Sequence, residues 1–204
     1  MGLVHCDCIC TVLCIDMKIA ITGHTKGIGQ ACTELLSQNH EVVGFSRSNG
    51  SDIKNLSWPN EDIDQFDVFI NNAHYENHQK RILEILFERW SNTNKHIINV
   101  GSMLELRTVQ GVEHSKILMS YREYKLALFN THNKFVYSVH GQNLPLHLSY
   151  IRPCAVDTEM LDIAGNVGLA DLVANKQVLT PQQVAECVKF MIAMPNIIDM
   201  SLLK

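Results

Sequence analysis

The amino-acid sequence predicts a single α/β domain, in which a parallel β-sheet is covered by helices on both faces. Short apolar runs alternate along the chain with longer segments whose apolar residues recur at helical spacing. The runs are almost wholly apolar, which is typical of strands buried on both sides of a parallel sheet. No internal repeat and no flexible linker divides the 204 residues. We expect one domain over residues 17–204, preceded by a poorly ordered leader over residues 1–16.

Six segments predict the strands in chain order. They cover residues 18–22, 41–45, 67–70, 96–100 and 146–151, with residues 197–200 as a candidate edge strand. Amphipathic helices are expected over residues 28–36, 82–90 and 115–140. A last helix begins after Thr180, which can act as its cap, with Pro181 at the first helical position and Gln183 closing a capping box.

The composition excludes several classes of protein. Hydrophobic residues make up 46% and charged residues 19% of the chain, so it has enough apolar material to offset the entropy of folding. The net charge of -4 argues against a nucleic-acid partner, and no apolar run reaches the roughly 18 residues of a membrane span. Four of the seven cysteines crowd the first 14 residues without the paired spacing of a zinc site. Reduced cysteines and the lack of an export signal favour a cytoplasmic protein without a bound metal.

A glycine-rich turn follows the first predicted strand, where residues 22–29 read T-G-H-T-K-G-I-G. Gly23 lets the chain turn sharply, Gly27 leaves room for a pyrophosphate, and Gly29 lets the helix approach the sheet. The helix that follows offers unpaired N–H groups to phosphates. This context predicts a dinucleotide site on a Rossmann-type, doubly wound sheet, and the alternative is a tight turn without a ligand. The candidate contacts in the turn are Gly23, Thr25, Lys26, Gly27 and Ile28.

The spacing G-x-x-x-G-x-G resembles the cofactor turn of the short-chain dehydrogenase/reductase family, and four further motifs extend the resemblance to the C-terminus. Residues 71–74 read N-N-A-H where the family usually has N-N-A-G, and Ser102 follows the fourth strand. Tyr121 and Lys125 form a Tyr-x-x-x-Lys motif, and residues 153–158 look like P-G-x-V-x-T with a cysteine for the glycine. The resemblance implies an NAD(P)-dependent oxidoreductase that interconverts a carbonyl and an alcohol on a small molecule, commonly as a homodimer or homotetramer. It also implies cofactor contacts from Asn72, Ala73 and Pro153.

The end of the second strand favours NADP over NAD. Residues 44–48 read G-F-S-R-S and contain no carboxylate of the kind that holds a free adenosine ribose. Ser46 can donate a hydrogen bond to a 2′-phosphate, while Arg47 and Lys26 can supply positive charge. The alternative is that Arg47 is a solvated surface residue. Asp52 and Ile53 resemble the family's pair of residues beside the adenine ring.

The Tyr-x-x-x-Lys motif carries the expected chemistry. Tyr121 and Lys125 lie four residues apart and therefore project from one face of a helix. A carbonyl that accepts a hydride becomes an alkoxide that needs a proton, and the ammonium of Lys125 is expected to lower the tyrosine pKa from about 10. The resemblance implies that Lys125 also holds the nicotinamide ribose and that Ser102 binds the substrate oxygen. The alternative is a half-buried tyrosine beside a solvated lysine.

The chain also departs from the family pattern. The segment between Asn72 and Ser102 is short, and only Asn77 is a candidate for the fourth catalytic residue, an asparagine. Arg107, Glu113 and His114 are candidates for the substrate mouth, whereas all ten histidines, His74 among them, are expected to be surface or structural residues. The short segment favours a second hypothesis, a nucleotide-sensing module without productive catalysis. An epimerase or dehydratase is a third, and this chain has little room for its larger substrate region.

Overall fold

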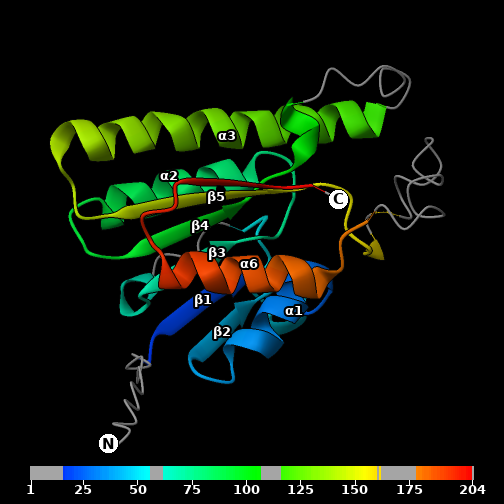
Figure 1. Cartoon of the computed structure of the whole chain (residues 1–204), viewed down its shortest axis with the longest axis horizontal. Helices are drawn as coiled ribbons and strands as arrows, with labels where there is room; N and C mark the ends of the chain where they lie inside the picture. Colours follow the sequence, from blue (N-terminus) through cyan, green and yellow to red (C-terminus); the bar gives the residue numbers. More distant parts are fainter. Residues whose placement is uncertain (1–15, 56–61, 107–115, 160, 162–177, 204) are drawn as a thin grey trace, which may run out of the picture.

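The computed structural model describes residues 16–55, 62–106, 116–159, 161 and 178–203. Its centre is a six-stranded sheet in the order β2-β1-β3-β4-β5-β6, and every neighbouring pair is parallel. Helices α2 and α3 lie on one face of this sheet, and helices α1 and α6 lie on the other (Figure 1). The doubly wound, three-layer α/β fold predicted from the sequence is therefore confirmed.

The described elements are six strands, four α-helices and three short 3-10 turns. Their bounds are β1 (Lys18–Thr22), α1 (Gly27–Leu36), β2 (Glu41–Phe45), η1 (Arg47–Asn49), η3 (Ile63–Gln65), β3 (Val68–Asn71), α2 (His78–Trp90), β4 (His96–Val100), η4 (Met103–Leu106), α3 (Lys116–Gln142), β5 (His147–Pro153), α6 (Pro181–Ala193) and β6 (Asp199–Leu202).

The strands contribute to two hydrophobic clusters because their side chains alternate between the faces of the sheet. Ile19 and Ile21 of β1 point into the cluster shared with α1 and α6, whereas Ala20 between them joins the cluster under α2 and α3. All three are fully buried. The apolar run of β1 is therefore continuous because this strand has a core on both sides.

The predicted strand bounds hold for β1, β2 and β4, whereas β3, β5 and β6 begin one or two residues later than expected. The capping box before α6 is confirmed: the Gln183 backbone N–H donates to Thr180 Oγ1 (3.2 Å), and the Thr180 N–H donates to Gln183 Oε1 (2.9 Å). The predicted leader lies outside the described residues apart from Asp16, as do Arg107, Glu113 and His114. Among the described helices, none combines the length and apolar character needed to cross a membrane.

The strand order predicts a crevice at the carboxyl edge of the sheet, beside β1. The chain leaves β1 toward β2 through α1 and then returns to form β3 on the other side of β1. The connections after β1 and β3 therefore diverge, and ligands of open α/β sheets bind where such connections separate at the carboxyl ends of strands. The glycine turn follows β1, residues 72–74 follow β3, and Ser102 follows β4, so all of them lie at this edge.

Two buried histidines make the fold sensitive to acid. Burial lowers the pKa of His96 in β4 to about 3 and that of His132 in α3 to about 4, from an ordinary value near 6.5. His96 shares a hydrogen bond with Ser149 Oγ (2.8 Å), and both rings are almost inaccessible to solvent. Because the unfolded chain binds these protons more tightly, the stabilisation is fully present above pH 6.5 and is lost as the pH falls toward 4.

We expect the free energy of unfolding to fall by about 1.4 kcal/mol per pH unit for each of these histidines between roughly pH 6 and pH 4.5. Urea unfolding at several pH values measures this slope. His132→Gln should flatten the slope by about that amount, while His140→Gln, at an exposed position of the same helix, serves as the control. An unchanged slope in His132→Gln would show that His132 is protonated as readily in the folded protein as in the unfolded chain.

Candidate functional site

The glycine turn between β1 and α1 has the backbone conformation that its glycines permit. Gly23 and Gly27 have φ angles of +72° and +54°, in the left-handed region that side chains disfavour. The Gly23 N–H donates to the Phe45 carbonyl at the end of β2 (2.7 Å). A Cβ atom at Gly29 would lie 2.1 Å from the Gly23 carbonyl oxygen, so only glycine lets α1 approach this closely.

Residues 72 and 73 hold the turn against the end of β3. The backbone N–H groups of Asn72 and Ala73 both donate to Thr22 Oγ1 (2.9 Å each), and Asn72 Nδ2 donates to the Thr22 carbonyl (3.0 Å). A Cβ atom at Gly23 would be 3.0 Å from that of Ala73. Thr22 therefore holds residues 72 and 73 against the end of β1, a role that the sequence motifs alone did not assign.

The start of α1 fits a pyrophosphate. Lys26 is the N-cap residue and makes no capping hydrogen bond with its side chain, so the first N–H groups of the helix keep their capacity to bind an anion. A Cβ atom at Gly27 would lie 3.0 Å from the methyl group of Thr158, in the loop that follows β5. Thr25 is exposed, and the Lys26 ammonium forms a 2.8 Å ion pair with Glu159, also exposed.

The end of β2 carries the residues predicted to select the cofactor. Ser46 caps the η1 turn and shares a 2.7 Å hydrogen bond with Ser48 Oγ, whereas Arg47 is exposed. Asp52 Oδ1 accepts a hydrogen bond from the Lys54 N–H (3.0 Å). Ile53 packs into the cluster under α2 and α3 and is buried there.

Ser102, Tyr121 and Lys125 lie together at the carboxyl end of β4. The hydroxyl groups of Tyr121 and Ser102 share a hydrogen bond, which favours the phenolate. The Lys125 Nζ atom lies 5.5 Å from the centre of the Tyr121 ring and donates to the Val100 carbonyl (2.7 Å). Lys125 is buried, so the alternative of a solvated lysine is wrong.

The expected lowering of the tyrosine pKa is wrong for the protein without a cofactor. Burial raises the pKa of Tyr121 to about 12, and the nearby charge of Glu105 adds to this effect, which outweighs the Ser102 hydrogen bond. Burial also lowers the pKa of Lys125 to about 7, although Glu105 opposes that change. Tyr121 is thus a protonated phenol at neutral pH.

Several residues that sequence reasoning missed complete the surroundings. Gln79 of α2 is buried, and its Oε1 atom accepts a hydrogen bond from Lys125 Nζ (2.7 Å), whereas Asn77, the predicted candidate, is exposed. Glu105 of η4 is also buried and forms a 2.6 Å ion pair with Arg152 Nε. The pKa of the Glu105 carboxyl is raised above its ordinary value, because the effect of burial outweighs that of its hydrogen bonds with Tyr150 and Arg152, which lower it.

His74, expected to be a surface or structural residue, packs against Tyr121. The two rings meet edge to face with their centres 4.7 Å apart. Burial and the charge of Lys125 lower the pKa of His74 to about 3, so its ring is neutral at physiological pH. The Nδ1 atom of His74 is buried and has no hydrogen-bond partner among the described residues. No local sequence signal distinguishes His74 from the other histidines.

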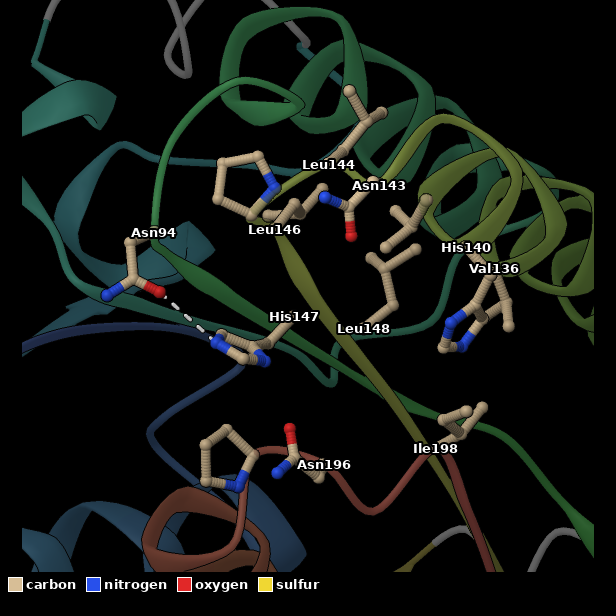
Figure 2. Close-up of a pocket in the computed structure, with 13 residues that line it drawn as sticks. Asn94, Val136, His140, Asn143, Leu144, Leu146, His147, Leu148, Asn196 and Ile198 are labelled. Atoms are coloured by element: carbon tan, nitrogen blue, oxygen red, sulfur yellow. Dashed lines mark hydrogen bonds between the residues drawn. The ribbon is translucent and has the colours of Figure 1, made fainter.

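A cavity of about 510 Å³ lies away from these residues, at the amino ends of β4, β5 and β6 (Figure 2). It is lined by the end of α3 and by segments around residues 94, 147 and 196, and His147 shares a 3.2 Å hydrogen bond with Asn94. None of the predicted site residues lines it. It is therefore separate from the crevice at the carboxyl ends of the strands.

Comparison with known proteins supports the fold. No family model matches the sequence, and no curated protein is significantly similar to it. Solved structures do match. A 3-alpha-hydroxysteroid dehydrogenase from a Pseudomonas species, complexed with NADH, has a TM-score of 0.69 and 18% identity, covering 90% of this chain and 94% of its own.

Two further structures have similar scores. A 3-ketoacyl-(acyl-carrier-protein) reductase from Brucella melitensis, complexed with NADH, has a TM-score of 0.72 at 14% identity. A short chain dehydrogenase from Burkholderia cenocepacia, in complex with NADP, has a TM-score of 0.65 at 14% identity. Each alignment covers 92% of this chain and 96% of the other. The chain therefore has the fold of the short-chain dehydrogenases and reductases, as the sequence motifs led us to expect.

Proposed function

We propose that the protein is an NADP-dependent oxidoreductase that interconverts a carbonyl and an alcohol on a small molecule. The observation that carries this proposal is the grouping of Ser102, Tyr121 and Lys125 beside the glycine turn. The two parts are joined through residues 72–74: Ala73 packs on Gly23, and His74 packs on Tyr121. An anion-binding helix start and a proton donor are thus held at the same edge of the sheet.

In the direction of reduction, the chain's own residues handle the substrate oxygen. NADPH, when bound, supplies the hydride. Ser102 donates a hydrogen bond to the carbonyl oxygen and steadies its developing negative charge. Tyr121 then donates its hydroxyl proton to that oxygen, which completes the alcohol. The Lys125 ammonium stabilises the phenolate that remains, because its charge lies close to the ring.

The cofactor would be held by the residues around the crevice. The start of α1 takes the pyrophosphate, and Ser46 and Arg47 at the end of β2 take the 2′-phosphate. Lys26 can join them, because its ion pair with Glu159 is exposed and therefore weak. The remaining contacts proposed from the resemblance are Asp52 and Ile53 at the adenine, Asn72, Ala73 and Pro153 along the crevice, and Lys125 at the nicotinamide ribose.

Titration with NADPH and NADH, followed by tryptophan fluorescence, tests the first half of this proposal. Trp58 and Trp90 supply the signal. We expect NADPH to bind at least tenfold more tightly than NADH, and Arg47→Ala to remove most of that difference. A panel of small aldehydes and ketones then tests turnover through the oxidation of NADPH.

The outcomes separate the two candidate functions. Oxidation of NADPH by at least one carbonyl supports the oxidoreductase. Tight binding of NADPH without turnover of any carbonyl would favour a nucleotide-sensing module, the hypothesis motivated by the short segment between Asn72 and Ser102. Failure of both cofactors to bind would contradict the proposal as a whole.

A further inference from the structure

Gln79 occupies a position where four elements meet. It is the second residue of α2 and is only 2% exposed. Its side-chain nitrogen donates to the Asn71 carbonyl at the end of β3 (2.8 Å) and to the Val100 carbonyl at the end of β4 (3.2 Å). Its side-chain oxygen accepts a hydrogen bond from Lys125 of α3 (2.7 Å). One amide group therefore joins two strands to the helix that carries Tyr121.

The contacts of Lys125 explain why this amide matters. An ammonium group has three N–H donors and no acceptor. In the described part of the chain, Lys125 Nζ donates to Gln79 Oε1 and to the Val100 carbonyl, both at 2.7 Å. Gln79 itself donates to the same Val100 carbonyl, so the three groups form a closed triangle. Two of the three N–H groups of the ammonium are thereby engaged by described residues.

Gln79 is held in place by further hydrogen bonds. Asn71 Nδ2 donates to the Gln79 carbonyl (2.8 Å) and to Asn99 Oδ1 (2.9 Å). Both asparagines are fully buried, on the neighbouring strands β3 and β4. The Gln79 main chain is therefore tied to the sheet independently of its side chain, and rotation of the amide away from Lys125 would remove a donor from the Asn71 and Val100 carbonyl groups.

Charged and titratable groups on several elements lie near Lys125. Glu105 of η4 contributes a negative charge, with Arg152 of β5 paired behind it. Tyr121 lies on the same helix as Lys125, and the neutral His74 packs on Tyr121 from the loop after β3. Among these groups, none is a neutral side chain that accepts a hydrogen bond from the Lys125 ammonium, as Gln79 does. A carboxylate in its place would add charge, and an apolar side chain would remove an acceptor from a buried ammonium.

We propose that Gln79 is a positioning residue, which holds the Lys125 ammonium in the orientation that serves Tyr121 and the bound nicotinamide cofactor. This inference rests on the proposed function. The amide comes from the first turn of α2, whereas Asn77, the sequence candidate for a fourth catalytic residue, is exposed.

Two substitutions test the proposal because they should act in opposite directions. Gln79→Leu removes an acceptor from the ammonium, so Lys125 loses its proton at lower pH. Gln79→Glu keeps an acceptor and adds negative charge, so Lys125 keeps its proton to higher pH. A hydrogen bond to a charged group is equivalent to about one pH unit. General damage to the fold would not shift the two variants in opposite directions.

The first measurement follows Lys125 directly by NMR of 15N-labelled lysine side chains, with the signal assigned through Lys125→Met. In the protein without cofactor, we expect the titration midpoint to fall by about one pH unit in Gln79→Leu and to rise in Gln79→Glu. The second measurement is the pH profile of carbonyl reduction. Its alkaline limb should move in the same directions, with kcat at neutral pH about tenfold lower in Gln79→Leu and the KM for the carbonyl little changed.

Gln65→Leu is the matched control, because Gln65 accepts a 2.5 Å hydrogen bond from Lys18 at an exposed position. It should leave both measurements unchanged. If Gln79→Leu does not fold, the shift in Gln79→Glu decides the question. Unshifted profiles, or shifts of the same sign in both variants, would overturn the inference while wild-type turnover left the proposed function standing. If the wild type reduced no carbonyl, the proposed function would fail, and with it this role, whatever the NMR titration gave.

Discussion

Tyr121→Phe is expected to lower kcat for carbonyl reduction by about 10²- to 10⁴-fold, the usual contribution of a positioned general acid. The substitution removes only the hydroxyl group, which shares a hydrogen bond with Ser102. The phenylalanine ring keeps the packing against His74. Since the phenol is proposed to act on the substrate oxygen, the affinity for NADPH should change by no more than a few-fold. Steady-state kinetics and fluorescence titration measure the two quantities.

Tyr124→Phe is the matched control, because Tyr124 lies on the same helix and its ring centre is 6.1 Å from that of His74. It has Leu128 rather than a lysine one turn later. This variant should retain nearly full activity. Equal activity of wild type and Tyr121→Phe would remove Tyr121 from the mechanism, and equal loss in both variants would indicate a general disturbance of α3.

Gly29→Ala is expected to destabilise the protein by about 3 kcal/mol or more and to abolish measurable cofactor binding. The new Cβ atom would lie 2.1 Å from the Gly23 carbonyl oxygen and 2.8 Å from Asn72 Nδ2. A main-chain oxygen cannot rotate away as a side chain can, so α1 must move off the sheet. Both the packing of the helix and the shape of the glycine turn then change. Urea unfolding and NADPH titration measure the two effects.

Gly141→Ala provides the comparison for this prediction. Gly141 lies near the end of α3, and a Cβ atom there would meet nothing within 4 Å. Alanine is the better helix former, so this variant should be neutral or more stable by up to about 1 kcal/mol. A Gly29→Ala protein with wild-type stability and NADPH affinity would mean that the close approach of α1 to Gly23 is not required.

The fold was predictable because its signals are local. The run over residues 18–22 is apolar on both faces, and the structure buries Ile19, Ala20 and Ile21 completely. The start of α6 was predictable for the same reason, because the capping box formed by Thr180 and Gln183 lies within four residues of sequence. Strand ends were less predictable: β5 continues to Pro153 because it pairs with β6, a long-range contact that no local pattern reports.

The site was predictable only where its motifs are local. Tyr121 and Lys125 share a helix face, so their spacing alone places them together. Gln79 reaches Lys125 across 46 positions of sequence, and no periodicity indicates such a contact. The direction of the Tyr121 pKa shift was missed because the expectation counted nearby positive charge and left out burial. Burial disfavours both charged forms, the Tyr121 phenolate and the Lys125 ammonium. Glu105, also distant in sequence, raises the pKa of Tyr121 as burial does.

The most direct test of the proposed function is the fate of the transferred hydrogen. NADPH carrying deuterium at both hydrogen positions of carbon 4 of the nicotinamide ring, mixed with the protein and a carbonyl that it reduces, should yield an alcohol with deuterium on the former carbonyl carbon. The same mixture with Tyr121→Phe should bind the cofactor and form little of this product. Alcohol without deuterium, or bound NADPH that transfers none to any carbonyl, would contradict hydride transfer at this crevice.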